Sequence, residues 1–345
     1  MRFIETVFQK LKRHPKRIVF PEGTEPRVLR AAARFVKLQL GAPVVLGVKK
    51  AIEKVALDEG ISLDHIGIID PVTSSELDVF VPRLEKLKRY RDVGSKQARE
   101  TLANPNYFGA MMVQYNLVDA LVTGAHEAAS SSLRPLIQII KPLPTTTSIS
   151  SCMMLDLSNK RYGERGVMLF ADCAVIPDPS VEQLANIAVQ TGALCRQLTG
   201  NKPRIAMLSF STKGSAANLP SPQKVAAATA LARQKAEEQL LEMEIDGELQ
   251  ADTALLTDLA LKKAPASLVA GKANVLVFPD LNSGNISAKL VQYLAGAETY
   301  GQILLGLTKP CADMSRGASE DDILGVAAIL GLQAIEYRKL YPAEP

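Results

Sequence analysis

Histidine and cysteine are scarce in this chain of 345 residues. The three histidines lie far apart, at positions 14, 65 and 126. The pair His126-Glu127 lacks the second histidine of an HExxH zinc motif. The four cysteines form no CxxC pair, and three of them lie in apolar segments, which is typical of reduced thiols in a protein core. We therefore expect no metal site and no disulfide bonds.

Long apolar runs and an excess of one charge are also missing. No run approaches the roughly 18 apolar residues of a membrane span, and the basic segment 1–17 lacks the apolar core and the cleavage site of a signal peptide. The 40 basic residues nearly balance the 36 acidic ones, and the two signs are interspersed. The charge pattern of a nucleic-acid binder is therefore missing. We expect a cytoplasmic protein without membrane or nucleic-acid partners.

The composition and the apolar pattern favour an α/β protein. With 47% hydrophobic and 22% charged residues, the chain is typical of globular proteins, and its length favours two domains. Short apolar strands alternate with amphipathic helices between residues 17 and 70, which is typical of βαβ units and a parallel sheet. Thr24 is predicted to cap the helix after the first strand, with Pro26 in its first turn. From residue 145, two strand-like segments follow one another without a helix, which indicates a domain boundary near 145–150.

Polar loops follow the predicted strands at 119–125, 204–211, 273–279 and 301–307. In open α/β sheets, ligands bind beyond the carboxyl ends of the strands, so these loops are candidates for an anion site. The candidate ligands in or just after the first three loops are Arg134, Lys213, Gly214, Ser215, Asn285 and Lys289. Arg134 is equally consistent with an ordinary surface arginine, and the loop with Lys213 is not a Walker motif.

The fourth loop holds the densest group of reactive side chains. Ser315, Arg316 and Gly317 place a hydroxyl, a cation and a flexible backbone joint in consecutive positions. Guanidinium offers paired N–H donors, and glycine lets backbone amides approach the same anion, so this group suits a phosphate or a carboxylate. Three acids follow at 320–322, where a carboxylate can move a proton beside that anion. We interpret the nearby Cys311 as a packing residue.

A structural interpretation of the same segment stays open. Ser319 and Asp322 have the S-x-x-[DE] spacing of a capping box, and the helix dipole favours acids in a first turn. On the local pattern alone, capping is the stronger interpretation. The two interpretations are compatible, because a capping residue can also face a cleft.

Seven segments resemble the phosphate acetyl/butyryl transferase family. They read IVFPEGTEPRVLRAA, YFGAMMVQYNLVDALVTGA, LRPLIQIIK, LSFSTKGSA, DGELQAD, GKANVLVFPDLNSGNI and KPCADMSRGASEDDI. They follow the family's order over nearly the whole chain. The resemblance implies a phosphate acetyltransferase, which converts acetyl-CoA and phosphate reversibly into acetyl phosphate and CoA. In that reaction a CoA thiolate attacks directly, without a covalent acyl-enzyme.

The resemblance also implies an architecture. It consists of two open αβα domains with mainly parallel sheets and an interdomain cleft, similar to isocitrate and isopropylmalate dehydrogenases. Domain I would comprise residues 1–147 and 305–345, and domain II, through which a homodimer forms, residues 148–304. The implied partners are CoA, acetyl phosphate and phosphate. No tightly bound cofactor is implied, since CoA is a substrate.

The family's motifs imply roles for individual residues. Asp322 resembles the base, Arg316 the arginine that binds the anion and the transition state, and Ser315 a hydroxyl that positions the thiol or the intermediate. Arg134 resembles a second substrate-binding arginine, and the family's basic segment, R-K-H-K-G, corresponds to KRYRD here. We assign its arginine to Arg89 rather than to Lys88.

A second departure lies after the VTGA segment. Ala128 and Ala129 stand where family members commonly carry hydroxyl residues. Ser130 to Ser132 follow directly, and we take Ser130 as the substitute.

Three other functions stay open. The first is a non-catalytic acetyl-CoA-sensing module, like the C-terminal region of malic enzymes. It is disfavoured by the presence of Ser315, Arg316 and Asp322 and by the lack of a partner domain in this chain. The second is a phosphate butyryltransferase. The third is a metal-dependent dehydrogenase of the related fold, which is disfavoured because the chain has no dinucleotide-binding fingerprint.

Overall fold

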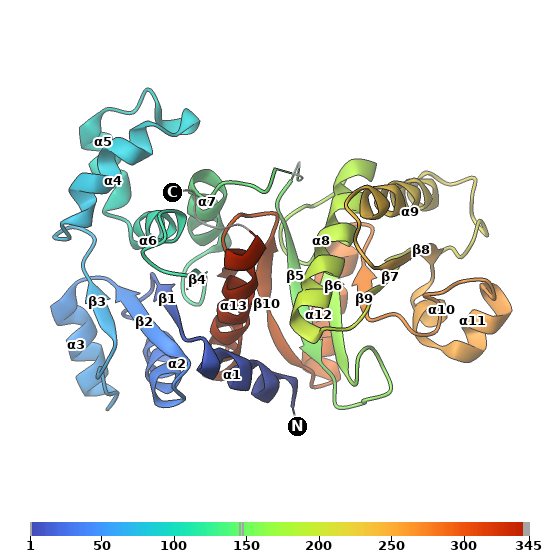
Figure 1. Ribbon diagram of the computed structural model, residues 1–345, viewed down its shortest axis with the longest axis horizontal. Helices are drawn as coiled ribbons and strands as arrows, with labels where there is room; N and C mark the ends of the chain where they lie inside the picture. Colours follow the sequence, from blue (N-terminus) through green and yellow to red (C-terminus); the bar gives the residue numbers. More distant parts are fainter. Residues whose placement is uncertain (1, 145, 147, 341–345) are drawn as a thin grey trace. The chain divides into compact units, whose positions relative to one another are not determined.

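The computed structural model describes residues 2–144, 146 and 148–340 as an α/β fold with mainly parallel strand pairs (Figure 1). Its residues fall into two compact units. Unit 1 holds residues 1–143 and 307–345, and unit 2 holds residues 144–306. Residue 147, where we place the predicted end of the first domain segment, lies outside the described residues. The domain limits drawn from the sequence therefore stay a prediction.

Unit 1 contains a parallel sheet in the strand order β3-β2-β1-β4-β11. Its strands are β1 (Lys16–Phe20), β2 (Gly41–Leu46), β3 (Gly67–Ile69), β4 (Ala120–Thr123) and β11 (Cys311–Asp313). All four residues of β4 are buried, so helices cover both faces of the sheet at its centre. The predicted parallel sheet of the first segment is confirmed.

The helices of unit 1 follow the strands as the apolar pattern predicts. They are α1 (Phe3–Arg13), α2 (Pro26–Lys37), α3 (Lys49–Asp58), α4 (Glu76–Glu85), the 3-10 helix η1 (Lys88–Tyr90), α5 (Ser95–Leu102), α6 (Pro105–Gln114), α7 (Ala129–Ile139) and α13 (Glu320–Leu340). The predicted cap at Thr24 is wrong. The N-cap of α2 is Glu25, whose carboxylate accepts from the Arg27 N–H, because the helix begins one residue later than the Thr24 signal requires.

Helix α13 lies in the core of unit 1. Its segment 323–334 is buried throughout and packs against α1, α2, β1 and β4. A helix buried on all sides is apolar all round rather than on one stripe, which explains its weak amphipathic pattern. This packing anchors the helix, so that its N-terminus is held at the carboxyl end of β11.

Unit 2 contains the strand order β10-β5-β6-β9-β7-β8. Its strands are β5 (Ser150–Asp156), β6 (Val167–Ala171), β7 (Arg204–Leu208), β8 (Glu244–Leu249), β9 (Val275–Val277) and β10 (Glu298–Leu305). Its helices are α8 (Val181–Thr199), α9 (Pro220–Glu238), α10 (Ala251–Leu255), α11 (Thr257–Lys263) and α12 (Leu281–Leu294). Strand β5 pairs antiparallel with β6 and β10, whereas the other pairs are parallel. The two consecutive strands predicted after residue 145 are confirmed as this β5-β6 pair.

The four cysteines are free thiols buried in these cores, as expected. Burial raises the pKa of the Cys311 thiol, so Cys311 is a packing residue in β11. Among the described residues, no helix combines the length and the apolar character needed to cross a membrane.

Candidate active site

Two of the predicted polar loops leave the same edge of the unit 1 sheet. Strands β4 and β11 are parallel neighbours in which Asp313 is the partner of Thr123. The Met314 N–H also donates to the Thr123 carbonyl over 2.6 Å. The loop after β4 (124–128) and the loop after β11 (314–319) therefore start side by side. The two loops converge as predicted, but the second one leaves β11, which was not predicted, rather than the strand predicted at 301–307.

The second of these loops exposes the predicted anion-binding group. Ser315, Arg316 and Gly317 are exposed, whereas the following Ala318 is buried. The Ala318 N–H donates to the Ser315 carbonyl over 2.8 Å, which turns the chain back toward the sheet. The Arg316 guanidinium has no hydrogen bond or ion pair with any residue that the structure describes. A fixed cation without a protein partner is available to an anionic ligand.

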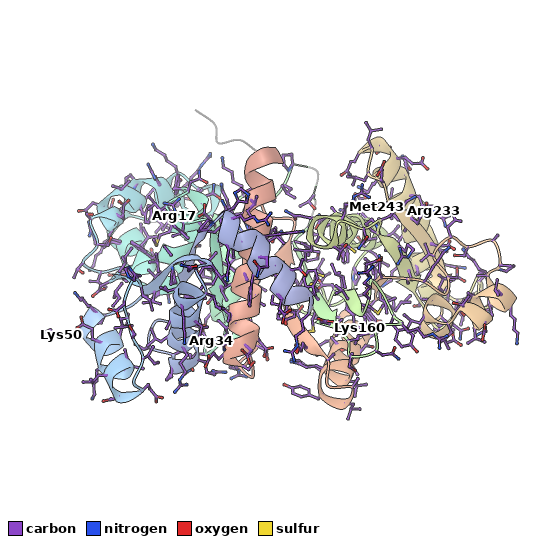
Figure 2. The ribbon with its side chains drawn as sticks, turned by 60° about the horizontal axis from the view of Figure 1, so that its bottom comes forward. Arg17, Arg34, Lys50, Lys160, Arg233 and Met243 are labelled. Carbon is purple, nitrogen blue, oxygen red and sulfur yellow. The ribbon has the colours of Figure 1, made fainter. Side chains whose placement is uncertain are left out.

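The three acids after this loop have different partners. Arg34, on α2 (Figure 2), forms ion pairs of 2.7 Å with both Glu320 and Asp321. Asp322 instead accepts the Ser319 N–H over 2.8 Å, and its own N–H donates to the Ser319 hydroxyl over 3.1 Å. The predicted capping box is confirmed. Of the three acids, Asp322 alone has no cationic partner among the described residues, and its role as a base stays a prediction.

A second group of predicted residues lines one pocket of about 310 Å³ in unit 1. Arg89, Ser130 and Arg134 lie around it together with Leu133, Ile137 and Gln138. Gln138 is held by hydrogen bonds from the hydroxyls of two tyrosines, Tyr90 and Tyr107, over 2.5 and 3.1 Å. The pocket is thus lined by two exposed cations, Arg89 and Arg134, and by the side-chain amide of Gln138, which the two tyrosines hold in place. This arrangement suits an anionic group that carries an apolar part.

The serines that follow Ala128 divide into two kinds. Ser130 lines the pocket with Arg134, whereas Ser132 is buried and donates its hydroxyl hydrogen to Asp313 over 2.5 Å. Burial raises the pKa of Asp313 to about 6, although the Ser132 hydrogen bond acts in the opposite direction. Ser132 is therefore committed to joining α7 to β11, and the role of Ser130 as the substitute for the missing hydroxyls stays a prediction.

Glycine is required between these loops. Gly124 has a φ of +86°, and a Cβ atom at this position would lie 2.3 Å from an oxygen of Asp313. An alanine would therefore collide with the buried carboxyl and adopt an unfavourable backbone conformation. The glycine lets the chain turn tightly where β4 passes β11.

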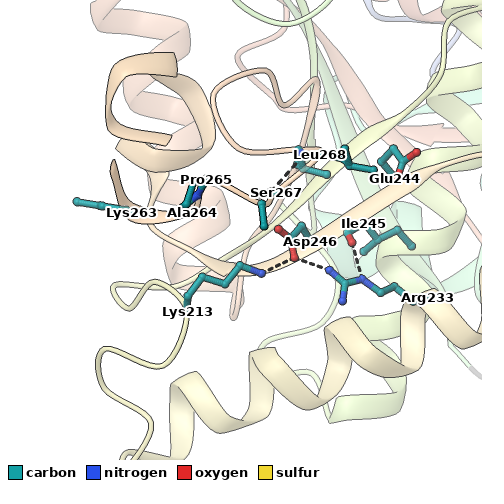
Figure 3. Close-up of a pocket in the computed structure, with 12 residues that line it drawn as sticks. Lys213, Arg233, Glu244, Ile245, Asp246, Lys263, Ala264, Pro265, Ser267 and Leu268 are labelled. Atoms are coloured by element: carbon teal, nitrogen blue, oxygen red, sulfur yellow. Dashed lines mark hydrogen bonds and ion pairs between the residues drawn. The ribbon is translucent and has the colours of Figure 1, made fainter. Parts of the chain in front are cut away.

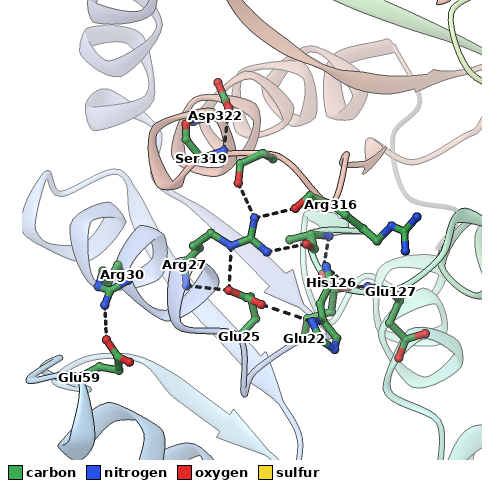
Figure 4. Close-up of polar contacts among 12 residues, drawn as sticks. Glu22, Glu25, Arg27, Arg30, Glu59, His126, Glu127, Arg316, Ser319 and Asp322 are labelled. Carbon is green, nitrogen blue, oxygen red and sulfur yellow. Dashed lines mark hydrogen bonds and ion pairs between the residues drawn. The ribbon is translucent and has the colours of Figure 1, made fainter.

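Three charged residues at the start of α2 and in the loop before it were not assigned any role from the sequence: Glu22, Glu25 and Arg27. Glu22 accepts the N–H groups of residues 125, 126 and 127 over 2.8 to 2.9 Å (Figure 4). Arg27 donates to the carbonyls of Ala125, Arg316 and Ala318. Glu25 accepts from the Arg27 side chain over 2.8 Å. The only signal was their place inside the segment IVFPEGTEPRVLRAA, whose local pattern indicates just a strand and a helix start.

In unit 2, the predicted donors of the loop after β7 already have protein partners. Lys213 forms an ion pair of 2.5 Å with Asp246, and the Gly214 N–H donates to Glu248 over 2.6 Å. The Ser215 hydroxyl lies 3.0 Å from that of Ser211. These residues were interpreted as a cradle for an anion, yet two of them are bound to acids in this structure. Their role in substrate binding stays a prediction.

Asp246, which binds Lys213, also forms an ion pair with Arg233 of α9. These residues line a pocket of about 530 Å³ (Figure 3). Asp246 is buried, which raises its pKa, but hydrogen bonds led by that of Lys213 keep the pKa below its ordinary value. The carboxylate is therefore charged at neutral pH and balances both cations.

The remaining two predicted ligands lie on α12. Asn285 donates to the carbonyl of Cys173 over 2.9 Å, and Lys289 lies 3.3 Å from the Gln292 side chain. Within the described part of the chain, no hydrogen bond or ion pair joins either residue to the loop with Lys213. The structure therefore leaves the five predicted residues of unit 2 as two separate groups.

Comparison with known proteins identifies the family. The family model described as phosphate acetyl/butaryl transferase matches residues 2–330. The chain belongs to this family of acyltransferases. A relative named phosphate acetyltransferase, from Thermoanaerobacterium thermosaccharolyticum, is 44% identical over 97% of this chain and 100% of its own length. The resemblance that we drew from seven sequence segments is confirmed.

Solved structures of the phosphate acetyl/butaryl transferase family share the fold. The EutD phosphotransacetylase from Staphylococcus aureus matches with a TM-score of 0.87 and 37% identity, covering 96% of this chain and 98% of its own. A putative 4-hydroxythreonine-4-phosphate dehydrogenase from Salmonella typhimurium matches with a TM-score of 0.55 at 14% identity, covering 93% of this chain and 99% of its own. The second match shows the fold alone. It confirms the expected likeness to dehydrogenases.

Proposed function

We propose that this chain is a phosphate acetyltransferase that moves an acetyl group reversibly between CoA and inorganic phosphate. Its membership of the family and its relatives of that name support the reaction. The observation that carries the proposal for the site is the exposed loop of Ser315 and Arg316. This loop comes shortly before Asp322, whose carboxylate accepts the Ser319 N–H at the start of α13. Counting only the residues that the structure describes, a hydroxyl, a cation without a protein partner and an acid without a cationic partner lie within eight residues.

In the proposed reaction, the thiolate of CoA attacks the carbonyl carbon of acetyl phosphate and phosphate leaves. Asp322 accepts the thiol proton through Oδ1, since Oδ2 is bonded to the Ser319 N–H. Arg316 binds the phosphate group and the negative charge that develops on the carbonyl oxygen. Ser315 positions the thiol or the intermediate. No covalent acyl-enzyme forms, and no tightly bound cofactor is needed, because CoA enters as a substrate.

The proton transfer alone does not explain a fast reaction. A thiol has a pKa of about 8.5 and an aspartate about 3.9, so an unperturbed aspartate is a weak base for it. Positioning and the charge of Arg316 must therefore supply much of the rate, and one such donor is typically worth about 3 to 4 kcal/mol.

We propose that the pocket of Arg89, Ser130 and Arg134 binds the phosphate groups of CoA. Two guanidinium groups at its border match an anionic ligand, and Leu133 and Ile137 offer apolar contacts. The predicted ligands of unit 2, from Lys213 to Lys289, would have to exchange their present protein partners for substrate. Their contribution is proposed as substrate binding rather than as chemistry.

A homodimer built through unit 2 and a cytoplasmic location complete the proposal. Helix α12 carries an exposed apolar stripe at Ile286, Leu290, Tyr293 and Leu294. These positions follow a helical spacing, and a second copy of the chain could cover them. The exposed fractions of 51 to 81% are unusual for large apolar side chains in a helix.

Assay of acyl phosphate formation from phosphate and a series of acyl-CoA esters tests the proposed function. We expect turnover with acetyl-CoA to exceed that with butyryl-CoA. A preference for butyryl-CoA would make the chain a phosphate butyryltransferase. Binding of acetyl-CoA without turnover of any ester would support the sensing module instead.

A further inference from the structure

Arg27 joins three segments of unit 1 that lie far apart in the sequence. It lies in the first turn of α2. Its Nη1 donates to the carbonyls of Arg316 over 2.9 Å and Ala318 over 2.7 Å, and its Nη2 donates to the carbonyl of Ala125 over 2.8 Å (Figure 4). Its Nε donates to Glu25 over 2.8 Å. One guanidinium therefore holds both loops that leave the sheet edge at β4 and β11.

Apart from the hydrogen bond of the Ala318 N–H to the Ser315 carbonyl, the segment 315–317 has few other restraints. Ser315, Arg316 and Gly317 are exposed. The Gly317 N–H reaches the Ser315 hydroxyl only over 3.4 Å, which is a weak hydrogen bond. Arg27 fixes the carbonyls of Arg316 and Ala318, which flank Gly317. It thereby restrains the glycine, which is the most flexible residue of the loop. The direction in which the Arg316 side chain leaves the backbone therefore depends on Arg27.

Two carboxylates support this arrangement: Glu25 binds Arg27, and Glu22 binds the loop after β4. Glu25 accepts both the Arg27 N–H, over 3.2 Å, and its Nε–H, so the arginine side chain is fixed to the start of its own helix. The hydrogen bond from Arg27 also keeps the pKa of Glu25 below its ordinary value, so this carboxylate remains charged. Glu22 meanwhile binds three successive amides of the loop after β4.

We propose that Arg27 is a positioning residue for the acyl transfer. Four of its five N–H groups donate within the protein, so we place it outside the group of substrate-binding residues. It acts by holding Ser315 and Arg316 in the orientation in which they meet the acyl phosphate. A lysine cannot replace it, since an ammonium group lacks the planar fork that reaches carbonyls of two loops at once. This inference rests on the function proposed above for Ser315 and Arg316.

Helix α2 also provides a matched control. Arg30 lies one turn further along and forms an ion pair with Glu59, away from both loops (Figure 4). We expect Arg27→Ala and Arg27→Lys to lower kcat by about 10- to 100-fold, because small displacements of catalytic groups have large effects on rate. The KM for acetyl-CoA should change little, since the proposed CoA pocket contains other residues. Arg30→Ala should keep both constants within about twofold, as expected for an exposed residue.

A second measurement separates positioning from a general loss of folded protein. Trypsin cleaves after arginine, and Arg316 lies in an exposed loop whose carbonyl is held by Arg27. We expect cleavage after Arg316 to become at least several-fold faster in Arg27→Ala at unchanged Tm, and to stay at the wild-type rate in Arg30→Ala. If Arg27→Ala does not fold, Arg27→Lys carries both measurements.

The outcomes are distinct. Wild-type kcat in both Arg27 variants, or a decrease that merely follows their loss of folded protein, would overturn the proposal. Unchanged cleavage after Arg316 in a folded Arg27 variant would overturn it as well. Failure of the proposed function appears separately, as a wild-type protein that turns over no acyl-CoA ester. In that case the cleavage measurement still decides whether Arg27 holds the loop.

Discussion

Ser319 and Asp322 exchange two hydrogen bonds at the start of α13, one in each direction. The Ser319 N–H and hydroxyl are both occupied, whereas Asp322 keeps its second oxygen free of partners within the described residues. The carboxylate that caps the helix is thus also open to a ligand. Its two possible roles can be separated by substitution, because the cap requires a hydrogen-bond acceptor and the base requires a titratable group.

Asp322→Asn should abolish most turnover and change stability little, because the amide oxygen of asparagine can still accept the Ser319 N–H. Ser319→Ala should lower stability and leave turnover nearly unchanged. It loses the side-chain cap, which typically contributes about 1 kcal/mol, and leaves the carboxylate in place. Turnover assays and thermal unfolding of both variants check the pair. A fully active Asp322→Asn enzyme would rule out Asp322 as the base.

Arg316→Lys should lower kcat by about 100-fold or more, which corresponds to the roughly 3 kcal/mol typical of one lost transition-state donor. Lysine keeps the positive charge but cannot offer two parallel N–H groups to a phosphate. The measurement is kcat at saturating acetyl-CoA and phosphate, with Arg30→Lys as the control. Equal loss in the control, or none in Arg316→Lys, would contradict the assignment.

The buried Asp313 predicts a pH-dependent stability. Its pKa is raised to about 6 from 3.8, so the folded state favours the neutral acid. Its contribution to stability is complete below pH 3.8 and is lost as the pH rises through about 6. Asp313→Asn stays neutral and keeps an acceptor for Ser132. The unfolding free energy of this variant minus that of the wild type should therefore increase by about 2 kcal/mol from pH 4 to pH 7.

Thermal unfolding of both proteins at these two pH values checks this expectation. A Tm difference between Asp313→Asn and the wild type that is the same at both pH values would show that Asp313 does not titrate in this range. Ser132→Ala is a useful companion, because it removes the hydrogen bond that favours the charged acid. It should raise the pKa of Asp313 further and steepen the loss of stability.

The stripe on α12 predicts the effect of a surface charge on assembly. Leu290→Glu places a carboxylate in the middle of the exposed apolar side chains and should convert the proposed homodimer into monomers. Leu261→Glu, on α11, changes an equally exposed leucine outside the stripe and should leave the dimer intact. Light scattering coupled to size-exclusion chromatography measures the mass. A monomeric wild type, or a dimeric Leu290→Glu variant, would contradict the proposed assembly.

Some sequence predictions were wrong or incomplete for an identifiable reason. The cap of α2 was assigned to Thr24, but Glu25 performs it, because its carboxylate also meets the Arg27 side chain. Lys213 and Gly214 were interpreted as open donors, yet Asp246 and Glu248 bind them across neighbouring strands. In both cases a local pattern identified a capable residue without showing which partner it has.

Local patterns were sufficient for most strands, although not for β8 and β11, for most helices and for the Ser319–Asp322 cap. Each of these depends on side chains a few positions apart, whose geometry follows from the backbone itself. Packing in three dimensions was needed to show that, among the described residues, Asp322 alone of the three adjacent acids lacks a cationic partner, to raise the pKa of Asp313 and to reveal Arg27. Arg27 lies 289 and 291 positions from the carbonyls that it holds in the second loop. No pattern within a helix or a strand encodes a contact over that separation, because it arises only when β4 and β11 become neighbours in the sheet.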